Sequence, residues 1–163
     1  MKKKLIIALA IFLFIICIAA LGWDFYVDEG TMNNSIELAV PLFNKKEKIE
    51  LQSKDFFNNE EVKKIYLSKG QGKKVLKSIE KNNNWVYGDL EEKIEEKMKL
   101  YTREGIYNQI PYIENKYWIF TNRSNQARDR HSIDETINDK YYAISLGIFD
   151  IDNNILYYYQ YDR

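Results

Sequence analysis

The chain has little cysteine, proline or glycine. Its 163 residues include one cysteine, two prolines and seven glycines. Cys17 lies inside a long apolar run, so the rest of the chain has no cysteine. This excludes a disulfide framework, a zinc–thiolate site and a cysteine nucleophile outside that run. Aromatic residues are frequent, with thirteen tyrosines, and this composition is typical of a folded domain and not of a disordered stalk.

The chain also lacks an excess of charge of either sign. It has 24 basic and 24 acidic residues. Without Lys2, Lys3 and Lys4 there are 21 basic and 24 acidic residues, a net charge of −3 for the part that follows. Because binding to nucleic acid depends on many cationic contacts to phosphate, we expect no nucleic acid among the partners.

Sequence motifs of enzymes are missing as well. The one histidine, His131, stands in a charged segment, and the sequence has neither a His-Glu-x-x-His nor a Gly-x-Ser-x-Gly pattern. We expect His131 to be a solvated loop residue. The sequence therefore predicts a protein that is not an enzyme and that holds no cofactor and no metal.

What the chain does have is an uninterrupted apolar run, Leu5–Trp23, directly after three lysines. As a helix this run rises about 28 Å, close to the thickness of the hydrocarbon core of a bilayer. Lysine-rich flanks stay in the cytoplasm. We therefore expect residues 1–23 to be a single-pass anchor in the cell membrane, with the amino terminus inside and all that follows outside.

A cleaved secretory signal is the alternative interpretation of the same run. Ala20 and Gly22 place small residues where a signal peptidase would cut. Against cleavage, the run is longer than the ~15 residues of a usual signal core, and Trp23 and Tyr26 suit the headgroup level of a membrane. We favour an uncleaved anchor, while cleavage would give the same domain in secreted form.

Beyond the anchor, the sequence predicts a linker and one domain. Residues 24–35 are polar and contain Gly30, Asn33 and Asn34, which interrupt any periodic pattern. Residues 36–163 have the length of one domain with its own core.

Three segments of this domain carry helix signals. Residues 59–67 begin with an asparagine that is able to cap a helix and with two acidic residues, and they are followed by Gly70. Residues 75–79 continue with helical spacing of apolar side chains. The clearest helix is 89–101, with Asp89 and Glu92 as a capping box, Glu95 and Lys99 spaced for an ion pair, and an apolar stripe of Leu90, Ile94, Met98 and Tyr101.

The remaining segments predict strands. Residues 35–40 and 48–51 are expected to pair with each other, and residues 117–121 alternate large side chains. Residues 142–148 and 155–161 flank the turn 150–154 and predict a hairpin. The fold class is therefore α+β, an antiparallel sheet packed on helices. Its expected core joins helix and sheet through Leu90, Ile94, Met98, Trp118, Phe120, Ile144, Leu146 and Ile148.

Asp150, Asp152 and Asn154 have the one-three-five spacing of a calcium loop. However, Ile155 stands where such a loop needs glycine, and Tyr161 stands where it needs a bidentate glutamate. Aspartate and asparagine are also frequent in hairpin turns. The segment is therefore interpreted as a turn.

Arg123, Arg128 and Arg130 form the most suggestive cluster of side chains. They lie in a polar segment between two predicted strands, where guanidinium groups are able to hold a phosphate or a carboxylate. The alternative is that Arg123 pairs with Asp129, Asp134 or Glu135 and braces the loop. We predict these arginines as the contact to an anionic envelope component or to an acidic patch of an envelope protein.

Residues 110–123 (IPYIENKYWIFTNR), 143–150 (AISLGIFD) and 154–159 (NILYYY) follow a common pattern. The pattern, IPxIxNxYxxF followed by an arginine and a strand–turn–strand end, resembles a family of small uncharacterised proteins of Gram-positive bacteria. Lys116 stands where that family has glycine, and Asn122 where it has aspartate. The resemblance covers residues 110–161 and implies a bacterial origin and this shape, but no site.

Together these features predict a membrane-anchored domain outside the cell that acts by binding. Two other classes stay open from the sequence. One is an envelope hydrolase or transferase that works through carboxylates or His131, and the other is an immunity or accessory factor.

Overall fold

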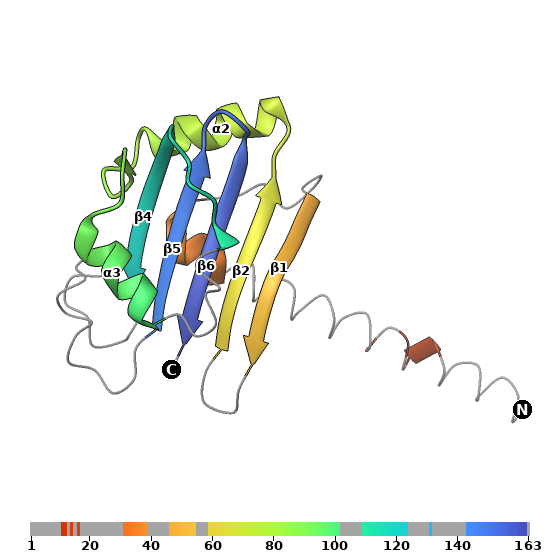
Figure 1. Ribbon diagram of the computed structural model, residues 1–163. Coiled ribbons are helices and arrows are strands. Elements are labelled where there is room, and N and C mark those ends of the chain that lie inside the picture. Colours follow the sequence, from red (N-terminus) through yellow and green to blue (C-terminus); the bar gives the residue numbers. More distant parts are fainter. Residues whose placement is uncertain are drawn as a thin grey trace, which may run out of the picture. The chain divides into compact units, whose positions relative to one another are not determined.

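The computed structural model of the chain describes residues 11, 12, 14, 16, 31–38, 46–54, 59–101, 109–123, 131 and 143–162 (Figure 1). The chain divides into two compact units, Met1–Asn34 and Ser35–Arg163. Residues 11, 12, 14 and 16 are helical. Among the residues just given, no helix has both the length and the apolar character needed to cross a membrane. The rest of Leu5–Trp23 lies outside the described residues, so the anchor stays a prediction.

The second unit is built on one antiparallel sheet. In space its strands follow the order β1-β2-β6-β5-β4-β3, so the last strand of the sequence lies between β2 and β5 (Figure 1). The described strands are β1 (Lys46–Lys54), β2 (Asn59–Tyr66), β3 (Val86–Tyr87), β4 (Lys116–Asn122), β5 (Ala143–Asp150) and β6 (Ile155–Asp162). With the helices described below, this confirms the predicted α+β class.

The strand register separates the side chains into two faces. Phe120 is opposite Leu146, which is opposite Tyr159, and Tyr159 is in turn opposite Val62. These four residues are buried in one hydrophobic cluster, and we call their side of the sheet the core face. Residues one position along each strand point to the other side, which we call the opposite face.

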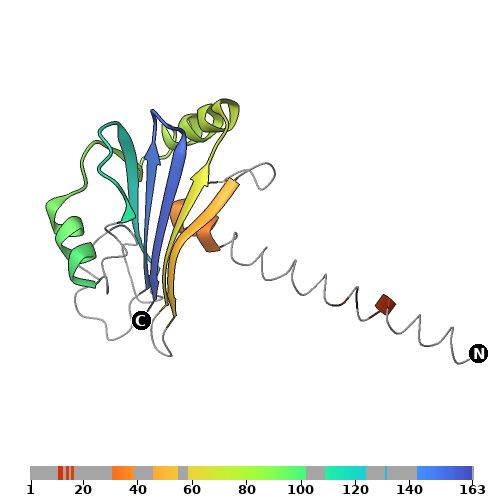
Figure 2. The ribbon, with the colours of Figure 1, turned by 45° about the vertical axis from the view of Figure 1, so that its right-hand side comes forward.

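Helix α3 (Glu92–Tyr101) covers the core face, as Figure 2 shows with α3 on one side of the sheet. Its Ile94 and Met98 are buried against the sheet, and burying each side chain stabilises the fold by about 1.5–3 kcal/mol. Leu90 packs against the same cluster. The predicted contact set is confirmed, because the cluster also contains Trp118, Phe120, Ile144, Leu146 and Ile148.

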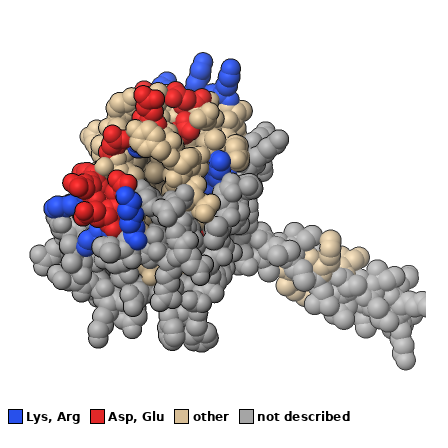
Figure 3. Space-filling view, in the orientation of Figure 1, with Lys and Arg blue, Asp and Glu red and all other residues tan. Residues whose placement is uncertain are grey.

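The predicted start of α3 at Asp89 was wrong. The helix begins at Glu92, and its first hydrogen bonds run from the amides of Ile94 and Glu95 to the Glu91 carbonyl. Asp89 does not cap the helix, because its carboxylate is bonded to Lys116 instead. The predicted ion pair between Glu95 and Lys99 is present at 2.8 Å. In Figure 3 the charged side chains over α3 are of both signs, as on an ordinary solvated helix face.

Residues 59–67 were predicted as a helix, and this was wrong. Residues 59–66 form β2, which pairs along its whole length with β6 and also with β1. The local helix signals are outweighed by hydrogen bonds to two neighbours and by the burial of Val62 and Ile65. The predicted strand at 48–51 exists within β1, but its partner is β2 and not residues 35–40.

The predicted strand at 35–40 was also wrong in its described part. Residues 31–36 are helical, and Glu37 has a φ of 54°, a left-handed conformation that a strand does not contain. Residues 39 and 40 lie outside the described residues. The backbone here is held against the opposite face of the sheet. The Thr121 hydroxyl donates to the Ser35 carbonyl at 2.6 Å, and the Trp85 indole N–H donates to the Ile36 carbonyl at 2.9 Å.

Helix α2 (Lys69–Ile79) confirms the helix predicted at 75–79 and begins earlier. Ser68 and Gln71 form a capping box, since each side chain bonds the backbone N–H of the other. Val75 and Ile79 are buried.

The hairpin of β5 and β6 is confirmed with its predicted turn. Both Asp150 carboxylate oxygens accept hydrogen bonds from Asn153, one from its backbone and one from its side chain. Asn154 has a φ of 54°, which asparagine tolerates. These contacts are those of a turn, as the sequence predicted for Asp150, Asp152 and Asn154.

Candidate functional site

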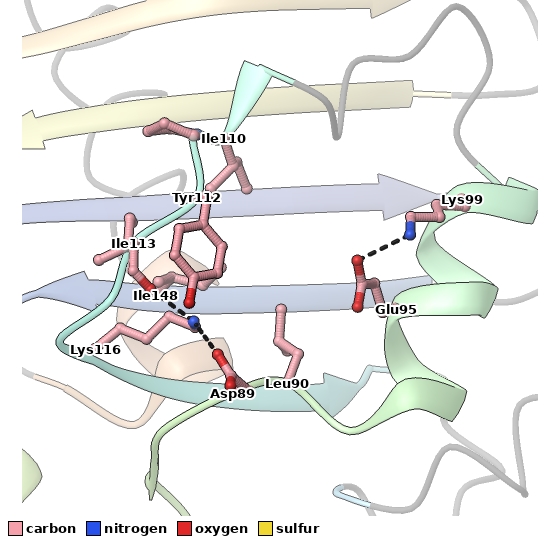
Figure 4. Close-up of a pocket in the computed structure, with 10 residues that line it drawn as sticks. Asp89, Leu90, Glu95, Lys99, Ile110, Tyr112, Ile113, Lys116 and Ile148 are labelled. Carbon is pink, nitrogen blue, oxygen red and sulfur yellow. Dashed lines mark hydrogen bonds and ion pairs between the residues drawn. The ribbon is translucent and has the colours of Figure 1, made fainter.

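A pocket of about 460 Å³ opens on the core-face side of the sheet, between α3 and the segment that leads into β4 (Figure 4). Sites for small ligands usually have volumes of 300–1,000 Å³. The residues around it come from three places in the sequence that the fold brings together. They are Asp89, Leu90, Glu95, Lys99, Ile110, Pro111, Tyr112, Ile113, Lys116 and Ile148.

Part of the pocket wall is apolar. Ile113 is buried, and Ile148 reaches the pocket from β5 as part of the hydrophobic cluster. Leu90 and Ile110 are partly buried against the same cluster. Tyr112 differs, because its side chain is 83 % exposed and projects into the open side of the pocket in Figure 4. The pocket therefore offers an apolar surface that is still reachable from solvent.

A buried ammonium group lies in this apolar wall. The side chain of Lys116 is only 7 % exposed, and its Nζ donates to Asp89 Oδ1 at 2.8 Å and to the Ile113 carbonyl at 2.7 Å. The same Nζ lies 5.1 Å from the centre of the Tyr112 ring, within the range of a cation–π contact. Asp89 is the exposed partner, with 79 % of its side chain accessible.

The position of Lys116 follows from the strand that it begins. Side chains of a strand alternate, so Lys116 points to the same face as Trp118 and Phe120. Gly88 and Asp89 are held beside it, because the Gly88 amide donates to the Lys116 carbonyl at 3.0 Å and the Trp118 indole N–H donates to the Asp89 carbonyl at 3.0 Å. The burial of Lys116 could be predicted from the sequence, since the alternation of residues 116–120 places this lysine among core residues.

A second ion pair lies on the helix side of the pocket. Glu95 and Lys99 are bonded at 2.8 Å across one turn of α3, with side-chain exposures of 45 % and 58 %. Such an exposed pair contributes only about 0.3–0.5 kcal/mol to stability. The pair therefore places one charge of each sign at the rim, and the two side chains are only weakly held together.

Of the three predicted arginines, only Arg123 is among the described residues, and it does not line this pocket. Lys116 is the first residue of β4, whereas Arg123 follows the last one. The Arg123 guanidinium is paired with the Asp162 carboxylate. It also donates to the Ile144 carbonyl at 3.4 Å. This partner differs from the acids that the sequence suggested, Asp129, Asp134 and Glu135. Arg128 and Arg130 lie outside the described residues, so the arginine contact stays a prediction.

The sequence predicted His131 as a solvated loop residue, and this was wrong, because both ring nitrogens have a partner. Its Nδ1 lies 2.8 Å from the Phe120 carbonyl oxygen, and its Nε2 lies 3.2 Å from Glu37 Oε1. Both partners are oxygen atoms that accept hydrogen bonds, and they come from segments far apart in the sequence. His131 thus ties its segment to β4 and to Glu37.

Glu37 collects several donors around its carboxylate. Asn82 and Asn84 donate to its Oε2 at 3.1 Å and 2.8 Å. Burial opposes the ionisation of this carboxylate, but the hydrogen bonds from Asn84 and Asn82 and the charge of His131 outweigh it. The pKa of Glu37 is therefore lowered below 4.5. This cluster joins segments that are far apart in the sequence, which is a structural role.

Among the described residues, no group of three or more histidine, cysteine or acidic side chains is placed to hold a metal ion. Comparison of the chain with protein-family models, with curated proteins and with solved structures gave no match. The resemblance to small proteins of Gram-positive bacteria therefore stays a prediction, and the pocket is interpreted from its own chemistry.

Proposed function

We propose that the chain is a binding protein held at the cell membrane by residues 5–23, with a domain outside the cell that takes a ligand into the pocket beside Lys116. The observation that supports this is the pocket itself. It combines an apolar wall, an exposed tyrosine ring and a buried ammonium group within about 460 Å³. Binding sites for small molecules commonly pair a largely apolar lining with a few placed polar groups.

Binding is favoured over the hydrolase alternative by the state of the acids in this pocket. Among the described residues, the two carboxylates that line it, Asp89 and Glu95, are each bonded to a lysine. A carboxyl group held by a lysine has to break that contact before it is able to exchange a proton with a substrate. We therefore propose a role in recognition rather than in hydrolysis.

The binding role is tested with the full chain, purified with its natural membrane and studied by native mass spectrometry. We expect an adduct that is lost when the pocket is filled by Ile110→Trp. The control is Tyr87→Trp, since Tyr87 is exposed and does not line the pocket. An adduct that survives Ile110→Trp, or no adduct in the unaltered chain, would contradict the proposal.

The location is tested separately by protease accessibility on intact cells and on spheroplasts, with a tag at the carboxy terminus. A full-length, membrane-bound chain that is digested from outside is the expected result. A chain that starts near Trp23 and is found in the medium would instead support signal cleavage and a secreted domain. Digestion only after the cells are opened would reverse the proposed orientation.

A further inference from the structure

The ion pair of Lys116 and Asp89 is unequal, and this points to the kind of ligand. The Lys116 side chain is 7 % exposed, whereas that of Asp89 is 79 % exposed. Lys116 is also held by the Ile113 carbonyl at 2.7 Å and is the first residue of β4, so the ammonium is fixed in place. Asp89 reaches the ammonium from solvent, and its carboxylate returns to water at little cost when it leaves.

The ammonium itself cannot be left alone in the pocket. A buried cation without an anion nearby is strongly destabilising. Departure of Asp89 therefore requires that another anion takes its place. A neutral or cationic ligand offers no such replacement, so the pair selects against both.

The other residues of the pocket indicate the chemistry of the rest of the ligand. Ile110, Ile113 and Ile148 present hydrocarbon surface, and the Tyr112 ring stands at the open side (Figure 4). The pair of Glu95 and Lys99 at the rim has one charge of each sign, so it adds no net attraction for the second negative charge of a ligand such as a phosphate ester. A single carboxylate, equal in charge and shape to the one that it replaces, fits best.

We infer that the pocket takes an apolar molecule that ends in a carboxylate, whose oxygens replace those of Asp89 on the Lys116 ammonium. This inference rests on the proposed binding function and names the ligand class. Two sources offer this chemistry, a fatty acid and the carboxy-terminal end of an apolar peptide. In either case the hydrocarbon part lies against Ile110, Ile113 and Ile148, and Asp89 turns out to solvent.

The test is a titration of the full-length protein in micelles, followed by NMR of the isoleucine methyl groups. Hexanoate is expected to shift the signals of Ile110, Ile113 and Ile148, and hexanol and hexylamine are expected to bind at least about tenfold more weakly, a difference of about 1.4 kcal/mol. The two sources are separated by comparing hexanoate with an N-acetylated dileucine as free acid and as amide. Whichever of the two acids binds more tightly identifies the source.

Variants of the two paired residues are expected to act in opposite directions. Asp89→Asn removes the competing carboxylate and should strengthen hexanoate binding severalfold. Lys116→Met removes the ammonium while keeping an unbranched chain, and should weaken it by at least about tenfold. Lys77→Met is the matched control, since this lysine is exposed on α2 and does not line the pocket. It should leave the affinity unchanged.

The Asp89→Asn result keeps the test valid if Lys116→Met does not fold. Equal binding of hexanoate and hexanol, no methyl shifts with either acid, or no gain in Asp89→Asn would each overturn the carboxylate assignment. If the natural adduct were still lost in Ile110→Trp, the binding function would stand and only the ligand class would be wrong.

Discussion

At the scale of single residues, Gly147 is a position where a side chain has little room. A Cβ placed on it would lie 2.9 Å from Ile36 Cγ2 and 3.1 Å from atoms of both Ile119 and Trp85. The close approach of residues 35–38 to the opposite face of the sheet therefore depends on the missing side chain. Any larger residue would push this segment, or the Trp85 ring, away from β5.

We predict that Gly147→Ala lowers the free energy of unfolding by about 1–3 kcal/mol, the usual cost of overpacking a core. Urea unfolding followed by fluorescence measures it. Gly70→Ala is the matched control, because nothing lies within 4 Å of its Cβ position. The control should be neutral or stabilising by up to about 1 kcal/mol, since alanine is a better helix former. An equal loss in both variants would refute the packing argument.

Glu37 makes stability depend on pH in the acid range. Its pKa is lower in the folded protein than the ordinary value of 4.5, so the unfolded chain binds the proton more readily. The stabilisation by Glu37 is therefore fully present above pH 4.5 and is lost as the pH falls below it, through the lower folded pKa.

We predict that Glu37→Gln reduces stability near neutral pH and that its difference from the unaltered protein shrinks below pH 4.5. Thermal unfolding over a series of pH values measures this difference. Glu80→Gln is the control, as an exposed acid that ends α2. A difference that stays constant across the acid range would show that charge at Glu37 is not the cause.

The position of Lys116 also shows how much of the site was accessible from sequence. The alternation of residues 116–120 places a lysine beside Trp118 and Phe120, so a buried cation was predictable. Its partner was not, because Asp89 lies 27 positions earlier and also satisfied the pattern of a helix cap. Only the fold determines which of these two roles the carboxylate has.

At the scale of elements, β2 and α2 show opposite outcomes of local signals. Residues 59–67 carry helix signals and form a strand, because β1 and β6 supply hydrogen bonds on both edges. Ser68 and Gln71 carry the same kind of signal and do begin a helix, where no strand competes for the segment. Local patterns therefore decided the structure only where tertiary pairing did not.

We predict that Ser68→Ala lowers the free energy of unfolding by about 1 kcal/mol, because the first turn of α2 loses its side-chain acceptor. Ser68→Asp keeps an acceptor and should retain the stability. Thermal unfolding of both variants, followed by circular dichroism, gives the comparison. If the alanine and aspartate variants were equally stable, the capping contact would have no energetic role.

At the scale of the whole molecule, the strand order predicts where the fold resists opening. Strand β6 has a hydrogen-bonded neighbour on each side, whereas β3 is two residues long and pairs only with β4. Much of the hydrophobic cluster is centred on β5 and β6. Regions with paired edges and buried side chains open least often.

We therefore predict that amides in 155–162 exchange with solvent at least about tenfold more slowly than those of Val86 and Tyr87. Hydrogen–deuterium exchange with mass spectrometry on the full chain measures both segments in one experiment. Peptides from 143–150 should resemble those from 155–162. Similar rates for β3 and β6 would mean that the sheet opens as one unit.

The central place of β6 also governs how the protein is made. It is the last of the six described strands to leave the ribosome, yet β2 and β5 have no shared neighbour until it arrives. At ~5–20 residues per second, the chain therefore spends seconds with two open strand edges after most of it has been synthesised. A premature stop within residues 155–162 would not shorten one end of the domain. It would leave two unjoined halves, a product for quality-control proteases rather than a smaller working protein.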